Sequence, residues 1–278
     1  MTVATLQSLL STGGVQSAIQ RASHKTGVDF TYLLGQAQVE SSLRPDAKAP
    51  TSSASGLYQF IEQSWLGTVK KHGAEHGLGW AADKISQGPS GRYYISDTAT
   101  RHYVLKLRNN PEIASLMAAE HAADNKAALE ASLGREAGGA DLYMAHFLGI
   151  GGAKKFLSTL QRNPQAAAAQ LFPAAAASNR GIFFGEGGRM RSVSEIYDRF
   201  AAKLQKGAEI AAGGKALPPI AAPGKADPAL QLAVIEQEDR PETATLDQLL
   251  ASADRPNLLR PTPDNAKLAY MLLASMGA

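Results

Sequence analysis

Glu40 is the residue whose position in this chain best suits acid–base chemistry. It ends a mostly apolar run, FTYLLGQAQVE, whose spacing is that of a helix, and it follows on the face formed by Leu33, Gln36 and Ala37. Partial removal from water raises the pKa of a carboxyl group, so that it stays protonated near neutral pH and can act as a general acid. The alternative is a solvated glutamate at a helix end, because most glutamates are exposed.

A loop of small and hydroxyl-bearing residues follows this helix. Its sequence, SSLRPDAKAPTSSASGLYQF, ends with Gly56, Tyr58 and Gln59 close together. A glycine lets a ligand approach the backbone closely, and hydroxyl and amide groups can hydrogen-bond it. The loop is therefore predicted to let a polymer approach its backbone.

Three short motifs and one later tyrosine occur along the chain in a fixed order. They are Glu40-Ser41, then Gly56-Leu57-Tyr58-Gln59, then Ala145-His146-Phe147-Leu148-Gly149, and finally Tyr197. In this order they resemble the lytic transglycosylases related to goose-type lysozyme. The motifs of that family are Glu-Ser, Gly-Leu-Met-Gln, Ala-Tyr-Asn-Ala-Gly and a later tyrosine that hydrogen-bonds the catalytic acid. Tyrosine replaces methionine in the second motif, and only the outer residues agree in the third. The resemblance covers residues 15 to 200.

The resemblance implies a role for each of these residues. Glu40 would be the catalytic acid and Tyr197 the group that orients it. Tyr197 also shares an apolar helical face with its neighbours, so a tyrosine that only packs in the core is the alternative. Thr51 and Ser52 are alternatives to Ser53 as the serine of the loop. The residues expected to bind the substrate are Ser41, Ser53, Gly56, Tyr58, Gln59 and Phe147.

The resemblance also implies a reaction, the cleavage of the MurNAc–GlcNAc β-1,4 bond of peptidoglycan. Glu40 would protonate the glycosidic oxygen while the N-acetyl group of the substrate stabilises the positive centre. The same residue, now a base, would take the proton of the C6 hydroxyl, which closes onto C1 and leaves a 1,6-anhydroMurNAc end. Most glycosidases use two carboxylates, but no second acid is evident at a matching position, and Glu62, which lies beyond Gln59, is expected to be a solvated helix residue. No cofactor is implied.

The segment HGAEH, His72 to His76, fits the inverted zinc-protease pattern H-x-x-E-H. Gly73 and Gly77 weaken the helix that would have to hold both histidines, and no third ligand stands out. A motif counts only in its structural context. We therefore expect a solvated helix end and no metal here, with a zinc site as the alternative.

Helices are expected to position all of these residues. Apolar residues recur at three- and four-residue spacing, and sustained strand alternation is missing. Helix starts are marked at Asn110-Pro111, at Asn163-Pro164 and at the capping box of Ser192 and Glu195, while residues 77–97 are expected to form a surface loop. The predicted fold is all-α and lysozyme-like. Its helices are predicted at Val15–Lys25, Phe30–Ser41, Tyr58–His72, Asp97–Leu107, Pro111–Ser132, Asp141–Leu148, Ala153–Leu160, Pro164–Leu171 and Val193–Gln205.

The composition changes after Lys206 and divides the chain. Residues 1–206 are expected to form the catalytic domain and residues 207–230, which are rich in Ala, Gly and Pro, a linker. Residues 231–278 contain four Lys or Arg and seven Asp or Glu and are expected to form a flexible acidic tail. Two short helices are predicted in it, at Thr245–Ser252 and Asn265–Ser275.

Charge and composition exclude several classes of protein. The net charge of +3 and the pI near 9.0 come from no dense basic run, which disfavours nucleic-acid binding and fits weak attraction to anionic polymers. The absence of cysteine excludes disulfides and thiolate metal sites. No stretch reaches the roughly 20 apolar residues of a membrane span. The start, MTVATLQSLLSTGG, lacks the features of a signal peptide, although the resemblance implies a periplasmic or cell-envelope location.

Two alternatives to the transglycosylase remain open. One is a hydrolase of the goose-type lysozyme kind, and the other is a non-catalytic wall-binding component of a secretion, flagellar or phage-tail apparatus. The Glu40-Ser41 pair argues against the second, because a pure binder has no need of a buried acid. The expected partners are peptidoglycan glycan strands and, for the tail, an envelope-spanning assembly.

Overall fold

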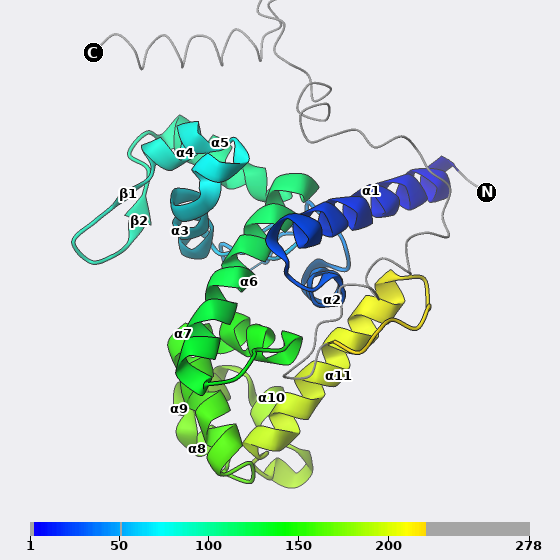
Figure 1. Ribbon diagram of the computed structural model, residues 1–278, viewed down its shortest axis with the longest axis vertical. Coiled ribbons are helices and arrows are strands. Elements are labelled where there is room, and N and C mark those ends of the chain that lie inside the picture. The colour runs from blue at the N-terminus through cyan, green and yellow to red at the C-terminus, as the bar shows by residue number, and fades with distance from the viewer. Residues whose placement is uncertain (1–2, 51, 221–278) are drawn as a thin grey trace, which may run out of the picture. The chain divides into compact units, whose positions relative to one another are not determined.

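The computed structural model describes residues 3–50 and 52–220 of the chain, and this part is all-α, as predicted. Its one sheet is a hairpin in which Ser86 lies opposite Tyr94 and Gln87 opposite Tyr93. None of the described helices has both the length and the apolar character needed to cross a membrane. The elements in chain order (Figure 1) are α1 (Val3–Thr26), α2 (Phe30–Ser41), α3 (Glu62–His72), η1 (Gly73–His76), α4 (Gly79–Lys84), β1 (Ser86–Gln87), β2 (Tyr93–Tyr94), α5 (Thr98–Lys106), η2 (Leu107–Asn109), α6 (Pro111–Leu133), α7 (Gly139–Arg162), α8 (Ala168–Leu171), α9 (Pro173–Ser178), α10 (Arg180–Phe183), η3 (Glu186–Gly188) and α11 (Val193–Ala211).

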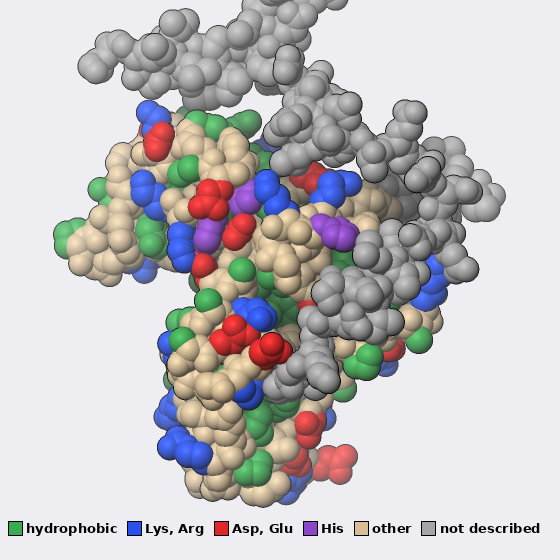
Figure 2. All heavy atoms as spheres, viewed as in Figure 1, with side chains coloured by type: hydrophobic (Ala, Val, Ile, Leu, Met, Phe, Trp, Pro, Cys, Tyr) green, Lys and Arg blue, Asp and Glu red, His purple; other side chains and the backbone are tan. Residues whose placement is uncertain are grey.

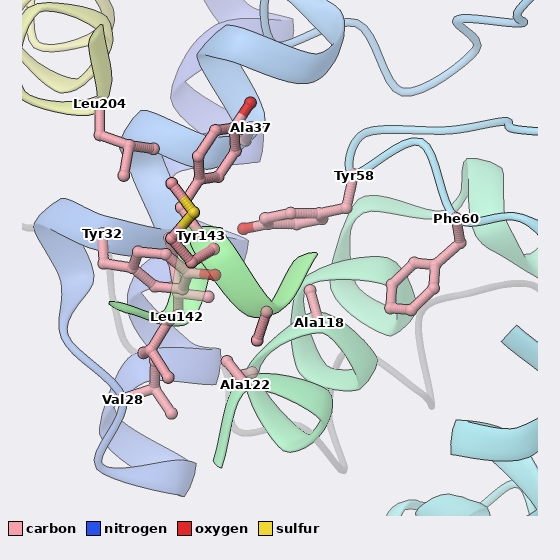
Figure 3. Close-up of a cluster of buried hydrophobic side chains, with 14 of the residues drawn as sticks. Val28, Tyr32, Ala37, Tyr58, Phe60, Ala118, Ala122, Leu142, Tyr143 and Leu204 are labelled. Carbon is pink, nitrogen blue, oxygen red and sulfur yellow. The ribbon is translucent and has the colours of Figure 1, made fainter. Parts of the chain in front are cut away.

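The core is built where the longer helices meet. Helix α6 contacts α1, α3 and α7, and α11 contacts α2 and α7 (Figure 1). Figure 3 shows Tyr32 of α2, Ala118 of α6, Leu142 of α7 and Leu204 of α11 converging in one buried cluster. Burial of such side chains contributes roughly 25 cal/mol per Å² of apolar surface. The cluster therefore fixes the helices that carry the predicted site residues relative to one another.

Two glycines let α2 and α11 cross at close range. A Cβ atom on Gly35 would lie 2.6 Å from the carbonyl oxygen of Leu204, and one on Gly207 would lie 3.1 Å from the carbonyl oxygen of Gly35. Backbone atoms cannot give way as the end of a side chain can. The crossing therefore depends on the absence of a side chain at Gly35.

Several helix boundaries agree with the sequence prediction. Helix α2 spans Phe30–Ser41, as predicted. The side chain of Asn110 accepts hydrogen bonds from the backbone of the first turn of α6. At the start of α11, Ser192 and Glu195 form the predicted capping box. These helix starts were predictable because each depends on residues only a few positions apart.

Other boundaries differ from the prediction for local reasons. Helix α3 begins at Glu62 instead of Tyr58, because Gln59 adopts a left-handed φ of 47° and the chain there forms a tight loop. Helix α8 begins at Ala168 instead of Pro164, because Ala167 forms an extended bridge with Ser192. The expected surface loop 77–97 contains α4 and the hairpin, and the two helices predicted around Gly149 are one helix, α7, kinked at that residue.

The predicted start of the linker, residue 207, is wrong. Helix α11 continues to Ala211, where its small residues, among them Gly207, face the protein interior. The chain then stays attached to the domain, because the side-chain amide of Gln205 bonds the backbone of both Leu217 and Ile220. Alanine and glycine in this segment therefore serve close helix packing and do not mark a linker. The remainder of the predicted linker, the acidic tail and its two helices lie outside the described residues.

We expect Gly35→Ala to destabilise the protein by about 1–3 kcal/mol, because the added methyl group would push α11 away from α2. Gly151→Ala is the matched control, since Gly151 also lies in a helix but has open space around its Cβ position. This second change should stabilise the protein by about 0.5–1 kcal/mol through helix propensity alone. Equilibrium unfolding in urea measures both, and equal effects would contradict the close crossing.

Candidate active site

Glu40 lies in the last turn of α2, as predicted. The helix is capped by Asp29, whose carboxylate accepts a hydrogen bond from the backbone N–H of Tyr32. It ends because Ser42 and Leu43 turn into the left-handed region, with φ values of 54° and 58°. The side chain of Glu40 is only 18% exposed. The end of α2 thus delivers one carboxylate to a largely buried position.

Two side chains of α7 hold this carboxylate. The hydroxyl of Tyr143 donates a hydrogen bond to Oε1 of Glu40 at 3.0 Å, and Nε2 of His146 lies 3.3 Å from the same oxygen. The two rings stack, with centroids 5.7 Å apart, because residues three apart share one face of a helix. Among the described residues, the contacts recorded for this carboxylate are made at its Oε1 atom.

The pKa of Glu40 is lowered, which contradicts the sequence expectation. Burial raises this pKa, but the hydrogen bond and positive charge of His146 lower it, as do the hydrogen bond of Tyr143 and the charge of Lys203. The net result is a pKa below the ordinary glutamate value. In the free protein Glu40 is therefore a carboxylate at neutral pH, and it needs a source for the proton that a general acid donates.

Tyr197, the residue expected to orient Glu40, does not contact it. Its hydroxyl donates to Oδ1 of Asp141 at 3.1 Å. Asp141 is fully buried and also accepts hydrogen bonds from Arg135, at 2.7 Å, and from the backbone N–H of Gly138. This network fixes the start of α7. Tyr197 therefore supports the helix that carries the partners of Glu40 and is not itself one of them.

A groove of about 390 Å³ is lined by two neighbours of the acid, although Glu40 itself is not part of the lining. Gln36, one helical turn before Glu40, and His146, its partner, both line it. Burial is the main cause that lowers the pKa of His121 in the same groove, so this imidazole is neutral at neutral pH. The lining residues are Tyr32, Gln36, Tyr58, Gln59, Phe60, Ile61, Ser64, Ala118, His121, Ala122, Asn125, Ala145, His146, Gly149 and Ile150.

The groove receives only part of the predicted substrate-binding set. Gln59 and Tyr58 line it, and Figure 3 shows Tyr58 and Tyr32 reaching toward each other from opposite sides. Tyr58 is only 2% exposed, so it forms the floor of the groove and is not an open stacking surface. The amide of Gln59 donates to the backbone carbonyls of Ala47 and Gly56, which leaves its side-chain oxygen available.

The other four predicted substrate-binding residues have structural roles. The hydroxyl of Ser41 is buried and donates to the backbone carbonyl of its own helix. The hydroxyl of Ser53 accepts a hydrogen bond from the backbone of Glu62 at the start of α3. Phe147 packs edge-on against Phe200, with centroids 5.1 Å apart. These contacts place the three side chains in the scaffold of the site and outside the lining of the groove.

Gly56, the fourth of these residues, is required by packing. Its φ is 83°, and a Cβ atom there would lie 2.0 Å from the carbonyl oxygen of Arg108. The buried guanidinium of Arg108 in turn donates to the carbonyl oxygens of Leu105, Ser53 and Phe60. Close packing of the loop against Arg108 therefore explains Gly56, the first residue of the Gly-Leu-Tyr-Gln motif.

No protein-family model matches this sequence, so the chemistry of the site has to be inferred from its geometry. The residue that sequence reasoning missed is Tyr143. Its signal was present, because Tyr143 precedes His146 by three positions in DLYMAHF and so shares its helical face. A search of that face, in addition to the motif positions themselves, would have found it.

Tyr143→Phe should change the titration of Glu40, whereas Tyr197→Phe should not. Loss of the Tyr143 hydroxyl removes one of the groups that lower the pKa of Glu40, so this pKa should rise. Tyr197→Phe removes a hydrogen bond to Asp141 and should cost only about 1 kcal/mol of stability. Titration of the Glu40 carboxyl carbon by NMR separates the two variants, and an upward shift in Tyr197→Phe alone would reverse the assignment.

Proposed function

We propose that this chain cleaves peptidoglycan as a lytic transglycosylase, with Glu40 as its single catalytic carboxylate. The observation that carries the proposal is one largely buried, hydrogen-bonded glutamate whose partner His146 lines a groove, and the described lining of this groove contains no aspartate or glutamate. Two-carboxylate glycosidases hold their second acid about 5–9.5 Å from the first, across the scissile bond. Glu62 does not serve in this way, because its carboxylate pairs with Arg101. A mechanism in which one residue is acid and then base fits this arrangement.

The lowered pKa of Glu40 leaves this residue without a proton to donate, and His146 is the proposed source of that proton. When His146 is protonated, the pair holds one transferable proton between Nε2 and Oε1, which are 3.3 Å apart. A glycan strand in the groove displaces water, and separated charges are less stable in less polar surroundings. The proton then moves from the imidazolium to the carboxylate, and Glu40 becomes a neutral acid when the substrate arrives.

In the proposed reaction Glu40 is the only residue that gives a proton to the substrate or takes one from it. Its proton passes to the glycosidic oxygen as the bond from that oxygen to C1 breaks, and the N-acetyl group of the substrate stabilises the positive centre. The carboxylate takes the proton of the C6 hydroxyl, whose oxygen bonds C1 and forms the 1,6-anhydroMurNAc end. The hydroxyl of Tyr143 keeps the carboxylate oriented through both steps. No metal or cofactor enters this scheme, and the proposed action on peptidoglycan would require a location in the periplasm or cell envelope.

Glu40→Gln should reduce the release of soluble muropeptides from purified peptidoglycan by at least about 10²-fold, because an amide cannot donate the catalytic proton. Glu62→Gln is the matched control and should keep most of the activity, since Glu62 lies outside the groove lining. Circular dichroism verifies that both variants are folded. Wild-type turnover in folded Glu40→Gln would remove the central claim.

The mass of the products separates the proposed reaction from its alternatives. A transglycosylase leaves anhydro-muropeptides, each one water lighter than the corresponding hydrolysis product. Reducing ends would instead identify a hydrolase of the goose-type lysozyme kind. Binding of glycan strands without any product would identify a non-catalytic wall-binding component, whose attachment to an envelope assembly we would then assign to the tail.

His146→Gln should move the high-pH limb of the rate profile to lower pH. In the wild-type protein the proposed proton donor is the pair of His146 and Glu40, whose atoms lie 3.3 Å apart, and imidazoles as a class hold a proton to higher pH than carboxyl groups do. In the variant, Glu40 must hold the proton alone. If His146 served only to lower the pKa of Glu40, its removal would raise that pKa and extend activity to higher pH. Initial rates on soluble glycan strands, measured from acid to alkaline pH, show which direction is correct.

A further inference from the structure

A second group of titratable side chains lies apart from the groove. It consists of His72, Glu75 and His76, where α3 passes into η1, and of Glu120 and Asp124 on α6. We call this set the histidine–carboxylate cluster. Figure 2 shows histidine side chains among acidic and basic ones on the face where α3 approaches α6.

Three members of the cluster converge as metal ligands do. One ligand atom each from His72, Glu75 and Glu120 lies within 4.8 Å of the other two. Nδ1 of His72 lies 3.5 Å from Oε2 of Glu120. A divalent ion with ligands at about 2.0–2.2 Å holds neighbouring ligand atoms about 3–4 Å apart, so a small inward movement of side chains would complete the site.

The other two members orient these ligands from outside. Nε2 of His72 lies 2.9 Å from Oδ2 of Asp124, which fixes the Nε2–H tautomer and leaves the lone pair of Nδ1 facing the cluster. Asp124 is itself anchored by Lys71. Nε2 of His76 lies 2.6 Å from Oε1 of Glu120, so that Oε2 of this carboxylate remains for the ion. The two partly buried ligands, His72 and Glu120, thus each have a supporting hydrogen bond.

A network of ion pairs is the alternative explanation of the cluster. The His76 side chain is only 4% exposed, and its Nδ1 has no hydrogen-bond partner in the described part of the chain. A buried polar atom without a partner is unfavourable. Ion pairing alone therefore leaves one nitrogen of the cluster unsatisfied.

We propose that the histidine–carboxylate cluster binds one first-row divalent transition-metal ion, of the zinc class, through His72, Glu75 and Glu120. One imidazole nitrogen favours such an ion over Mg²⁺ or Ca²⁺, which prefer oxygen ligands alone. Two carboxylates and one neutral imidazole also balance its charge. Sequence analysis found no third ligand for HGAEH because Glu120 comes from another helix, 44 residues beyond His76.

This site differs from the protease pattern that HGAEH resembles. Helix α3 ends at His72 and the chain continues as the 3₁₀ turn η1, so His72 and His76 are not one turn apart on a continuous α-helix. His76 supports Glu120 and is not a ligand. The proposed ion joins α3 and η1 to α6, and Ser64 of α3 and His121 of α6 both line the groove. Its role is to clamp this wall of the groove.

The test is a titration of the full chain, free of any histidine tag and freed of metal by a chelator. Isothermal calorimetry with Zn²⁺ should give one site per chain, and Co²⁺ should give visible absorption bands that Zn²⁺ abolishes. Zn²⁺ should raise the melting temperature, whereas Mg²⁺ at the same concentration should not. Equal stabilisation by Mg²⁺ would overturn the assigned class of ion, and no saturable binding would overturn the site.

Variants locate the binding without any activity measurement. Glu75→Gln changes an exposed side chain, so it should fold normally and weaken Zn²⁺ binding by at least about 10-fold, and Asp124→Asn should weaken it about 10–100-fold. Two control variants should bind Zn²⁺ like the wild type. They are Glu130→Gln, which lies on α6 like Asp124, and His146→Gln, which lies in the groove. Unchanged binding in Glu75→Gln, or loss of binding in His146→Gln, would place the ion elsewhere and overturn the proposal.

Discussion

A carboxylate that lies away from water needs partners, and this requirement organises the described part of the chain around Glu40. Both hydrogen-bonding partners, Tyr143 and His146, come from α7, more than 100 residues later in the sequence. Their position depends on where α7 begins. Asp141 fixes that start, because it is buried at the beginning of the helix and must be neutralised there by Arg135. Glu40 is thus supported indirectly by Asp141. The ion pair of Asp141 with Arg135 fixes the start of the helix that carries both partners of Glu40.

Helix α11 holds this arrangement together from the other side. It crosses α2 at Gly35, where the carbonyl of Leu204 occupies the space that a side chain would need. It also presents the ring of Phe200 edge-on to Tyr143, which supports the tyrosine against the acid, and Lys203 adds positive charge. Packing and electrostatics therefore act through the same helix. A change that loosened the crossing would move α11, whose Phe200 contacts Tyr143 and whose Lys203 lowers the pKa of Glu40.

Features that depend on neighbouring residues could be predicted from the sequence, and those that depend on distant pairs could not. The bounds of α2, the cap at Asn110 and the placement of Glu40 all follow from local spacing. The direction of the pKa shift did not follow, because burial was visible in the sequence while His146 and its charge were not. The motif position pointed to Tyr197, whereas the contact with Glu40 is made by Tyr143, which shares a helical face with His146. Glu120, the third ligand of the proposed metal site, could not be predicted either, since it comes from another helix.

The loop beside the acid is held in a different manner from the acid itself. Arg108 is buried, and its guanidinium donates to the carbonyl oxygens of Leu105, Ser53 and Phe60, with no carboxylate among these acceptors. Carbonyl groups do not titrate, and buried contacts are little affected by the screening that dissolved ions exert on exposed charges. The wall of the groove should therefore keep its shape through changes of acidity and ionic strength that reset the charge of Glu40. The charge of Glu40 can therefore change without a change in the shape of the nearby groove.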